Sequence, residues 1–428
     1  MKALSGAVLL ALAGCGAEDS GHDATLPPGT SAEFLTFYQD IAPLMDRYCI
    51  RCHDGAGLGP GDFRDPAVVD PLAALMLARM DAGEMPPPAA DPECNPYESA
   101  DRLYLDGADR DRFARWIETG KVLGDPNNEP TTDWPERHLS ATTHELHTTA
   151  PYTPDFVANN EYRCLILDWD EAEDKYITGF EPIIDHAAIS HHTILFVANP
   201  GEAETYVTDP ATQSWKCGIT PDNDWLTLHA WAPGNNAVEM PPGGGVLIPG
   251  GSKLVLQMHY YDSGPDAANT QDSPGYYLNT ANTVDTEIYF FPIGPTDFVI
   301  PAGDANHTET WAYRFLDFYG GLPLKTTLYG VFPHMHVLGK SYDFKGITAS
   351  GEDRCIAKAD RYDFANQPTY WFDEPVVFDA ADTLSVSCTW DNSAANPAQL
   401  NPTPTDVTWG EATDQEMCFA ILYASVGF

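Results

Sequence analysis

From about residue 151 onward, short apolar runs alternate with glycine, proline and asparagine turns, and this texture limits the folds open to the chain more than any other feature. The runs lie at residues 193–197, 253–261, 286–291, 325–331, 383–388 and 419–423. Apolar runs of this length between turn residues are typical of β-strands. The stretch is long enough for two all-β, jelly-roll-like sandwiches. We place the boundary between them near Gly294, which gives domains over 151–293 and 294–428.

Residues 31–121 follow a different pattern, which predicts a small all-α domain. Thr30 and Glu33 have the spacing of a capping box, in which each side chain satisfies a backbone N–H of the first turn. Apolar residues at helical spacing predict helices over 34–45, 71–80 and 108–119. Residues 122–150, which contain several prolines and threonines, are expected to form a linker or a wrapping loop. The chain is therefore expected to be multidomain.

The N-terminus has the features of an export signal. The apolar run at 7–13 is too short to cross a bilayer as a helix and is typical of the hydrophobic part of a signal peptide. It ends in Leu12-Ala13-Gly14-Cys15, which resembles the cleavage box of bacterial lipoproteins. That resemblance implies a signal peptide over 1–15, a lipid on Cys15 and a polar tether over 16–30. The alternative is an ordinary signal peptide cut nearby. In either case we expect an exported protein, periplasmic or anchored to the outer membrane, which meets the membrane only through its lipid.

The net charge excludes some classes of partner. The chain has 63 acidic against 22 basic residues, a net charge of -41, so its surface repels phosphate groups. Nucleic acids and anionic membranes are therefore not expected as partners. The charge is most simply an adaptation for solubility or high salt, and the alternative is attraction of a cationic substrate or a basic redox partner.

The residues at 49–53 read Cys49-Ile50-Arg51-Cys52-His53, a C-x-x-C-H motif. Two thiols at this spacing lie on one helical turn and can attach the two vinyl groups of a haem, and the following histidine can then bind the iron. The alternatives are a disulfide or a zinc site, but no second Cys/His pair at zinc spacing lies nearby. The motif therefore predicts one covalent haem c, held by Cys49, Cys52 and His53.

We expect Met85 to be the second axial ligand of this haem, because a thioether suits iron and raises its reduction potential. Met85 precedes three prolines, which stiffen the loop that presents it. Met76 and Met80 are competing candidates, but their helical spacing favours packing in the core. With the helix end at Trp116-Ile117-Glu118-Thr119-Gly120, residues 31–121 resemble class I cytochromes c.

Histidines gather at three places in the β-rich part: His191-His192, His259 and His334-Met335-His336. Imidazole binds copper, zinc, iron and nickel, and a methionine ligand favours copper. His334 and His336 point to the same face of a strand, so both can hold one metal ion. The adjacent pair His191-His192 would point to opposite faces of a regular strand, so sharing a metal requires a strand end or a bulge, or binding through different ring nitrogens.

The sequence segments around these histidines resemble those of a known family. They are Glu161-Tyr162-Arg163-Cys164, His191 to Phe196, Ala230 to Gly234, Gly250 to Lys253 with Leu256 to Tyr260, Val299 to Gly303, His334 to Lys340, and Glu416-Met417-Cys418. In this order, over about 155–428, they resemble the copper type II, ascorbate-dependent monooxygenases, which include the peptidylglycine α-hydroxylating and dopamine β-monooxygenases. The resemblance implies two copper ions, consumption of O2, and ascorbate or a periplasmic electron donor as reductant.

The resemblance also implies which residues hold the two coppers. It assigns His191, His192 and His259 to an electron-transfer copper, and it assigns His334, His336 and Met417 to an oxygen-binding copper that is the catalytic centre. Gln257, two residues before His259, is expected on the same strand face and is a candidate for ordering water or oxygen.

The cysteines left after processing and haem attachment are Cys94, Cys164, Cys217, Cys355, Cys388 and Cys418. Six thiols in an oxidising compartment favour disulfides, with fifteen pairings to choose from. The resemblance implies a Cys388–Cys418 disulfide beside the methionine ligand. Cys164 matches a cysteine of the family, but the place of its usual partner reads Asp272-Ser273-Pro274, which leaves Cys217 as one option for its partner.

The substrate differs from that of the peptide-amidating relatives. An arginine that binds the substrate carboxylate in those enzymes is replaced here by Phe332, and the residues after the Met-Cys pair are Phe419-Ala420-Ile421. We therefore expect hydroxylation of a C–H bond in a small, neutral or apolar molecule, with electrons supplied through the fused haem. Two rival functions remain: a haem and copper electron-transfer protein without oxygenase activity, and a non-catalytic β-sandwich binding module joined to a cytochrome.

Overall fold

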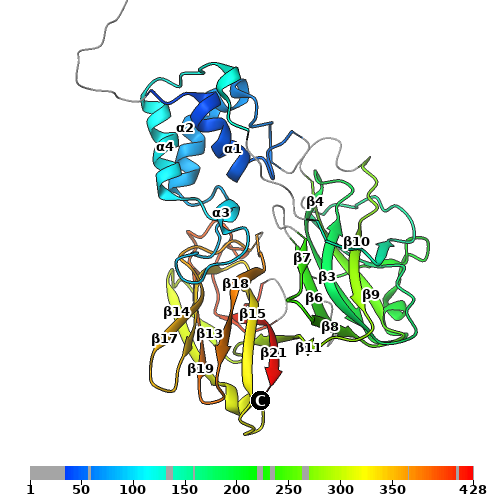
Figure 1. Cartoon of the computed structure of the whole chain (residues 1–428). Helices are drawn as coiled ribbons and strands as arrows, with labels where there is room; N and C mark the ends of the chain where they lie inside the picture. Colours follow the sequence, from blue (N-terminus) through cyan, green and yellow to red (C-terminus); the bar gives the residue numbers. More distant parts are fainter. Residues whose placement is uncertain are drawn as a thin grey trace, which may run out of the picture. The chain divides into compact units, whose positions relative to one another are not determined.

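The computed structural model describes residues 34–55, 59–131, 138–157, 160–218, 225–231, 237–262, 269–364, 366–410 and 414–427. The expected signal peptide, Cys15, the tether and the Thr30–Glu33 capping box lie outside the described residues. Within them the protein is mostly β, with several antiparallel sheets preceded by a few helices (Figure 1). No helix in these ranges is both long enough and apolar enough to cross a membrane.

The helices of the N-terminal part are η1 Phe37–Ile41, α1 Ala42–Tyr48, α2 Pro66–Asp81, α3 Ala100–Leu103, α4 Gly107–Glu118 and the short η2 Pro126–Asn128. The first of them begins at a reciprocal cap. The hydroxyl of Thr36 accepts from the N–H of Gln39 at 3.4 Å, and the Asp40 carboxylate accepts from the N–H of Thr36 at 2.7 Å. Two N–H groups that lack partners in the first turn are satisfied in this way.

Helix α2 starts five residues earlier than the apolar spacing predicts. The Asp65 carboxylate accepts from the N–H of Ala67 at 2.8 Å, and Pro66 occupies the first helical position, where its missing N–H costs nothing. Pro71, the expected first residue, lies inside the helix and removes one backbone hydrogen bond there. The apolar periodicity thus indicates the helix but not its first residue, since Pro66 and Pro71 are both suitable for the first helical position.

Helices η1, α1, α2 and α4 share one apolar core. Its fully buried members are Phe37, Ile41, Val69, Ala73, Phe113 and Trp116, with Met45, Leu44, Tyr48 and Met76 nearly so. Met80 packs against this core from outside, so both methionines weighed against Met85 contribute to packing, as their helical spacing suggests.

Residues 89–103 leave this helical core and pack in the second β-sandwich. Ala90, Tyr97 and Leu103 belong to the apolar core of that sandwich, and Cys94 forms a disulfide with Cys355. The N–H of Ala90 donates to the Tyr370 hydroxyl at 2.9 Å, and the Tyr97 hydroxyl donates to the Ala90 carbonyl at 2.7 Å. This segment, called the strap below, therefore connects the helical core to the second sandwich. The part of 31–121 that the structure describes does not pack as one self-contained unit.

The first sandwich consists of β1 His144–His147, β2 Asn160–Ile166, β3 Lys175–Ile183, β4 Ser190–Ala198, β5 Ser214–Lys216, β6 Leu226–Trp231, β7 Val238–Glu239, β8 Gly244–Ile248, β9 Lys253–Tyr261, β10 Gly275–Ala281 and β11 Thr286–Glu287, with a short η3 at Ala203–Tyr206. One sheet has the order β1-β10-β3-β8-β11, with β7 paired to β3, and the other has the order β5-β2-β9-β4-β6. Strand β1 lies in the stretch expected to be a linker and pairs with β10 instead.

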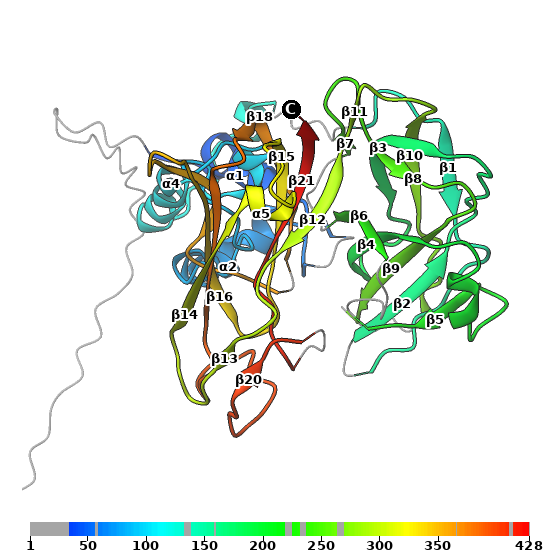
Figure 2. The ribbon, with the colours of Figure 1, turned by 90° about the horizontal axis from the view of Figure 1, so that it is seen from below.

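The second sandwich consists of β12 Tyr289–Ile293, β13 Val299–Ile300, β14 His307–Arg314, α5 Phe315–Phe318, β15 Lys325–His334, β16 Gly339–Ile347, β17 Asp353–Ala359, β18 Tyr370–Phe378, β19 Thr383–Trp390, β20 Val407–Thr408 and β21 Phe419–Gly427. Its main sheets have the orders β12-β21-β15-β18 and β14-β19-β16-β17. Figure 2 shows β12, β21 and β15 side by side.

The chain changes sandwich before Gly294. Strand β11 pairs with β8 of the first sandwich, whereas β12 pairs with β21 of the second, starting at Tyr289↔Ala424. The chain therefore crosses between the sandwiches at Ile288. The run 286–291, whose sequence pattern predicts one strand, is divided between two sheets. A run of strand-forming residues does not reveal such a change, because it can pair in either sheet.

Three disulfides join the six cysteines: Cys94–Cys355, Cys164–Cys217 and Cys388–Cys418. The last is the pair that the family resemblance implies. Disulfides of this number fit a protein that folds in an oxidising compartment.

A buried carboxyl group makes the stability of the first sandwich depend on pH. Asp272 is fully buried; its carboxylate accepts from the N–H of His186 at 3.1 Å, and burial raises its pKa to about 6. Because this value exceeds that of the unfolded chain, the group favours the fold below about pH 4, and the advantage is lost as the pH rises to about 6.

We therefore expect Asp272→Asn to stabilise the protein by about 2 kcal/mol at pH 7 and to have little effect at pH 4. Chemical unfolding at both pH values measures the difference. Asp170→Asn, whose side chain is 98% exposed, is the control and should behave like wild type. Equal stabilisation at pH 4 and pH 7 would contradict this assignment.

Candidate functional site

The three histidines of the first sandwich lie on neighbouring strands of one sheet. His192 on β4 is paired with His259 on β9, and the register of this pair shifts between Ser190 and His192. That irregularity is the bulge that two adjacent histidines need if both are to face one point. Sequence spacing predicts the requirement, and the strand register meets it.

The three rings converge through the same nitrogen. Nδ1 of His192 lies 3.5 Å from Nδ1 of His191 and 3.3 Å from Nδ1 of His259. On the other side of its ring, His259 places Nε2 2.7 Å from the Asn160 side-chain oxygen. Since that oxygen can only accept, Nε2 carries the proton and Nδ1 keeps its lone pair free for a metal.

Burial keeps this cluster neutral. Burial lowers the pKa of His192 well below its usual value, and the neighbouring histidines lower it further. Burial, followed by the charge of His191, lowers the pKa of His259 to about 3. The ligand atoms of the three residues lie within 4.8 Å of one another. Three neutral imidazoles this close together form a ready site for a cation such as copper or zinc.

The H-x-H pair lies where two strands of the second sandwich end. His334 is the last residue of β15 and is paired with Phe419, the first residue of β21. Met417 and Cys418 immediately precede β21, so the pairing of these strands brings Met417 beside the pair. The rings of His334 and His336 are 5.2 Å apart and nearly perpendicular, at 81°.

Both rings of this pair are held by Nδ1. His334 Nδ1 lies 2.8 Å from the Gln367 side-chain oxygen, whose amide nitrogen donates to the Phe364 carbonyl at 2.8 Å. His336 Nδ1 lies 3.0 Å from the Gln415 carbonyl. Nε2 of His334 is buried and has no hydrogen-bond partner among the described residues. His334 therefore offers Nε2 to a ligand, whereas the histidines of the first cluster converge through Nδ1.

The backbone between the two histidines is also fixed. The Tyr362 hydroxyl accepts from the N–H of Met335 at 3.0 Å and donates to the Met335 carbonyl at 2.7 Å. Burial and the charge of His336 lower the pKa of His334 to about 3, so its ring is neutral. The pair is therefore positioned and uncharged before any metal binds.

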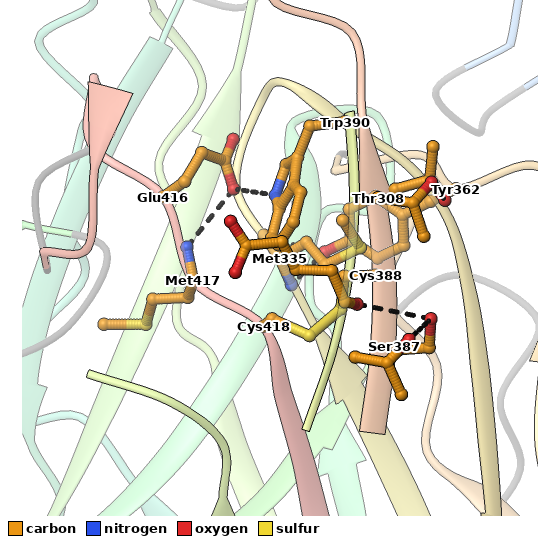
Figure 3. The surroundings of a disulfide bond; sticks show 12 residues. Thr308, Met335, Tyr362, Ser387, Cys388, Trp390, Glu416, Met417 and Cys418 are labelled. Carbon is orange, nitrogen blue, oxygen red and sulfur yellow. Dashed lines mark hydrogen bonds between the residues drawn. A yellow bond between two sulfur atoms is a disulfide. The ribbon is translucent and has the colours of Figure 1, made fainter. Parts of the chain in front are cut away.

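Glu416 is part of this site and was not singled out by the sequence. Its buried carboxylate accepts from the N–H groups of His336, Leu338 and Met417 and from the Trp390 indole, and Figure 3 shows the last two contacts. Burial raises the pKa of Glu416 to about 8, while these four donors oppose the rise. The available sequence signal is a charged residue next to an apolar Met-Cys pair at the start of a strand.

Met417 is 7% exposed, and its neighbour Cys418 is joined to Cys388 on β19 (Figure 3). The side chains around the H-x-H pair are aromatic. Phe332 stacks on His334 with centroids 5.9 Å apart, and Phe364 meets His336 edge-on at 5.9 Å. An apolar surrounding at this point agrees with the expectation drawn from Phe332.

Gln257 lies apart from this pair in its contacts. It is buried on β9, where its amide donates to the Gly218 carbonyl at 2.7 Å beside the Cys164–Cys217 disulfide. The structure gives it a partner in the backbone, and its role in ordering oxygen stays a prediction.

The C-x-x-C-H residues follow α1. Cys49 and Cys52 are not in a disulfide, and His53 stacks on Phe63 with its Nδ1 3.0 Å from the Pro60 carbonyl. Met85 is 47% exposed on the loop after α2. The pairing of Met85 with His53 as axial ligands stays a prediction.

Comparisons with known proteins agree with this geometry. The protein-family model described as "Copper type II ascorbate-dependent monooxygenase, N-terminal domain" matches residues 148–266 of the chain. The corresponding family model for the "C-terminal domain" matches residues 321–425. The first range contains the three-histidine cluster, and the second contains the H-x-H pair with Met417.

The human DBH-like monooxygenase protein 2 is 23% identical over 298 residues, which cover 65% of this chain. The chain spans 56% of that relative's length. Solved structures show only remote likeness. The infectious bursal disease virus VP2 subviral particle has a TM-score of 0.19 at 9% identity, covering 70% of this chain and 75% of its own. Allantoicase has a TM-score of 0.14 at 10% identity, covering 56% and 81%.

We expect His192→Ala to remove one bound copper from the first sandwich, because His192 Nδ1 lies between the other two ligand atoms. The measurement is metal analysis after loading and dialysis. His229→Gln is the matched control, since His229 is also a buried histidine of this sheet but bonds Tyr276 instead. Unchanged copper content in His192→Ala would contradict the site.

Proposed function

The chain belongs to the copper type II ascorbate-dependent monooxygenase family, and from this premise we propose that it hydroxylates a C–H bond of a small organic molecule with O2. The observation that carries the proposal is the presence of two neutral histidine sets, one in each matched domain, the first partly buried and the second buried. An electron-transfer protein with one metal, or a binding module without metals, has no need of the second set.

In this proposal His191, His192 and His259 hold the electron-transfer copper, and His334, His336 and Met417 hold the catalytic one. Imidazole nitrogens suit copper, and a thioether favours its reduced form, so the donors fit this metal. Copper bound at these places supplies one-electron redox chemistry and activation of O2.

The chain itself supplies orientation and a dry site. Asn160 and Gln367 each accept from the rear nitrogen of a ligand histidine, which fixes its tautomer and ring plane. Tyr362 fixes the backbone between His334 and His336. Since His336 is fully buried and His334 is 7% exposed, water is largely excluded from the ring atoms that face the substrate.

The substrate we propose is neutral and apolar or aromatic. Phe332 and Phe364 flank the two rings, and Phe419 follows the Met417-Cys418 pair in the sequence. A charged substrate would lose its hydration against these rings without gaining a counter-charge, which is costly. Substrate screening should therefore begin with uncharged aromatic and aliphatic molecules.

We further propose that residues 31–121 carry one haem c that donates electrons to the coppers, in place of or together with ascorbate. The two free thiols of Cys49 and Cys52 lie on one turn, and His53 keeps Nε2 available because its Nδ1 faces a carbonyl. Gly59 supports this fit, since a Cβ there would lie 2.5 Å from the His53 ring. Met85 is our candidate for the second axial ligand.

Export through a lipoprotein-type signal, with Cys15 as the lipidated residue, also belongs to the proposal. The three disulfides support an oxidising compartment such as the periplasm. The strongly acidic surface supports small molecules and redox proteins as partners rather than nucleic acid.

We expect copper-dependent O2 uptake by the reduced protein to fall at least about 100-fold in Met417→Ala, because the catalytic copper loses a ligand. Met240→Leu is the matched control, since Met240 has the same 7% exposure but lies in the apolar core of the first sandwich. Uptake that persists in Met417→Ala would overturn the assignment of Met417.

For the haem, we expect the exported protein to show a covalent haem c spectrum that is lost in the double variant Cys49→Ser, Cys52→Ser. Met85→Ala should keep the covalent haem but lower its reduction potential, because a thioether ligand raises that potential. Met76→Leu is the control and should keep both. A wild-type protein without haem, produced with a haem attachment system, would refute this part of the proposal.

A further inference from the structure

We propose that Glu416 is a positioning residue that fixes His336 and Met417 relative to each other, so that both meet the same metal. The inference rests on the proposed function, because it takes His334, His336 and Met417 as the ligands of one copper. Figure 3 shows Glu416 between the Met417 backbone and the Trp390 ring.

The need for such a residue arises from the strand ends. The pairing of β15 with β21 stops at His334↔Phe419, so beyond it the two segments no longer pair with each other. The segment 335–338 and the segment 414–418 both continue past this point, each carrying a ligand. Their N–H groups are buried and must find acceptors elsewhere, since an unsatisfied buried N–H is costly.

Glu416 supplies these acceptors with both of its oxygens. Oε2 lies 2.9 Å from the N–H of His336, 3.2 Å from that of Met417 and 3.1 Å from the Trp390 indole nitrogen. Oε1 lies 2.7 Å from the N–H of Leu338. One carboxylate thus joins both segments to β19, the strand that carries Trp390.

The identity of the side chain follows from this set of donors. All four partners are N–H groups, and a carboxylate has enough lone pairs to accept from all of them. A glutamine would turn an NH2 group toward some of these donors. No ion pair to Glu416 occurs among the described residues, and the four N–H donors replace the hydration that burial removes from its oxygens.

The contacts of Glu416 and its neighbours hold the ligand residues His336 and Met417 in place, in addition to stabilising the fold. The N–H of His336 is bound to Glu416 and its ring Nδ1 to the Gln415 carbonyl, so both contacts come from the segment that carries Met417. Met417 itself lies between two anchors, the carboxylate of Glu416 and the Cys388–Cys418 disulfide. His336 and Met417 therefore move as one unit, and His334 is held independently by Gln367.

The test compares Glu416→Gln with Asp382→Asn in the full-length protein. Asp382 is also buried and also accepts from backbone N–H groups, those of Ala349 and Asp379. It lies at the far end of the sheets, next to β19 residue Thr383, so it controls for loss of a buried acid that is remote from the ligands. The probe is Cu(I), titrated in competition with a chromophoric chelator, with X-ray absorption used to detect the copper–sulfur contact from Met417.

We expect Glu416→Gln to weaken the copper of the second sandwich by about 10- to 100-fold and to lose its copper–sulfur signal, while the three-histidine site keeps wild-type affinity. Asp382→Asn should keep both affinities and the signal. If Glu416→Gln does not fold, Trp390→Phe keeps Glu416 and removes one of its four donors together with part of a buried core ring, and it should weaken the same copper about fivefold.

Wild-type affinity and an intact copper–sulfur signal in Glu416→Gln would overturn the inference, as would an unchanged affinity in Trp390→Phe. Failure of the proposed function has a different signature. In that case the wild-type protein shows no copper–sulfur contact, and His334→Ala leaves its copper content unchanged.

Discussion

The antiparallel pairing of β15 with β21 is the interaction on which the candidate site of the second sandwich depends. It ends at His334↔Phe419, and this one register places the H-x-H pair of one strand beside the Met417-Cys418 pair of another, about 80 residues later in the chain. A shift of one residue would turn His334 to the opposite face of the sheet and separate the two. The disulfide to β19 and the Glu416 carboxylate hold the same strand ends from a third strand. Register, disulfide and hydrogen bonds thus act on one small volume.

The two histidine sets bring their ring nitrogens together by different backbone arrangements. In the first sandwich a bulge in β4 allows neighbouring residues to converge, and the three rings meet through Nδ1. In the second, Nδ1 of each ring is occupied by Gln367 or by the Gln415 carbonyl, and Nε2 is left for the ligand. The first set is partly buried and the second is buried, and burial lowers the pKa of His192, His259 and His334, so these rings are uncharged. Neutral rings without a carboxylate among them favour a metal that accepts soft or borderline ligands.

The sequence predicts the β architecture from local pattern, whereas the grouping of His259 with His191 and His192, which lie close together in the structure, comes from the family resemblance. Alternating apolar runs indicate strands, and adjacent histidines indicate a bulge, which β4 contains. Contacts between distant segments are harder to foresee. The strap at 89–103 packs with the second sandwich because Tyr97 and Leu103 find an apolar core there and Cys94 finds Cys355, none of which helical spacing can indicate. The role of Glu416 could not be predicted from the sequence for the same reason, since it depends on N–H groups that become available only where two strands end. The roles of Gln257 and Met85 remain predictions.

We propose that the two sandwiches hold one copper each, at His191, His192 and His259 and at His334, His336 and Met417. Anomalous diffraction at the copper edge from crystals of the copper-loaded protein would locate both ions. We expect two copper peaks, one in contact with Nδ1 of all three histidines of the first set, and one in contact with the Nε2 atoms of the H-x-H pair and the Met417 sulfur. A peak at only one of these places, or a second peak away from Met417, would contradict it.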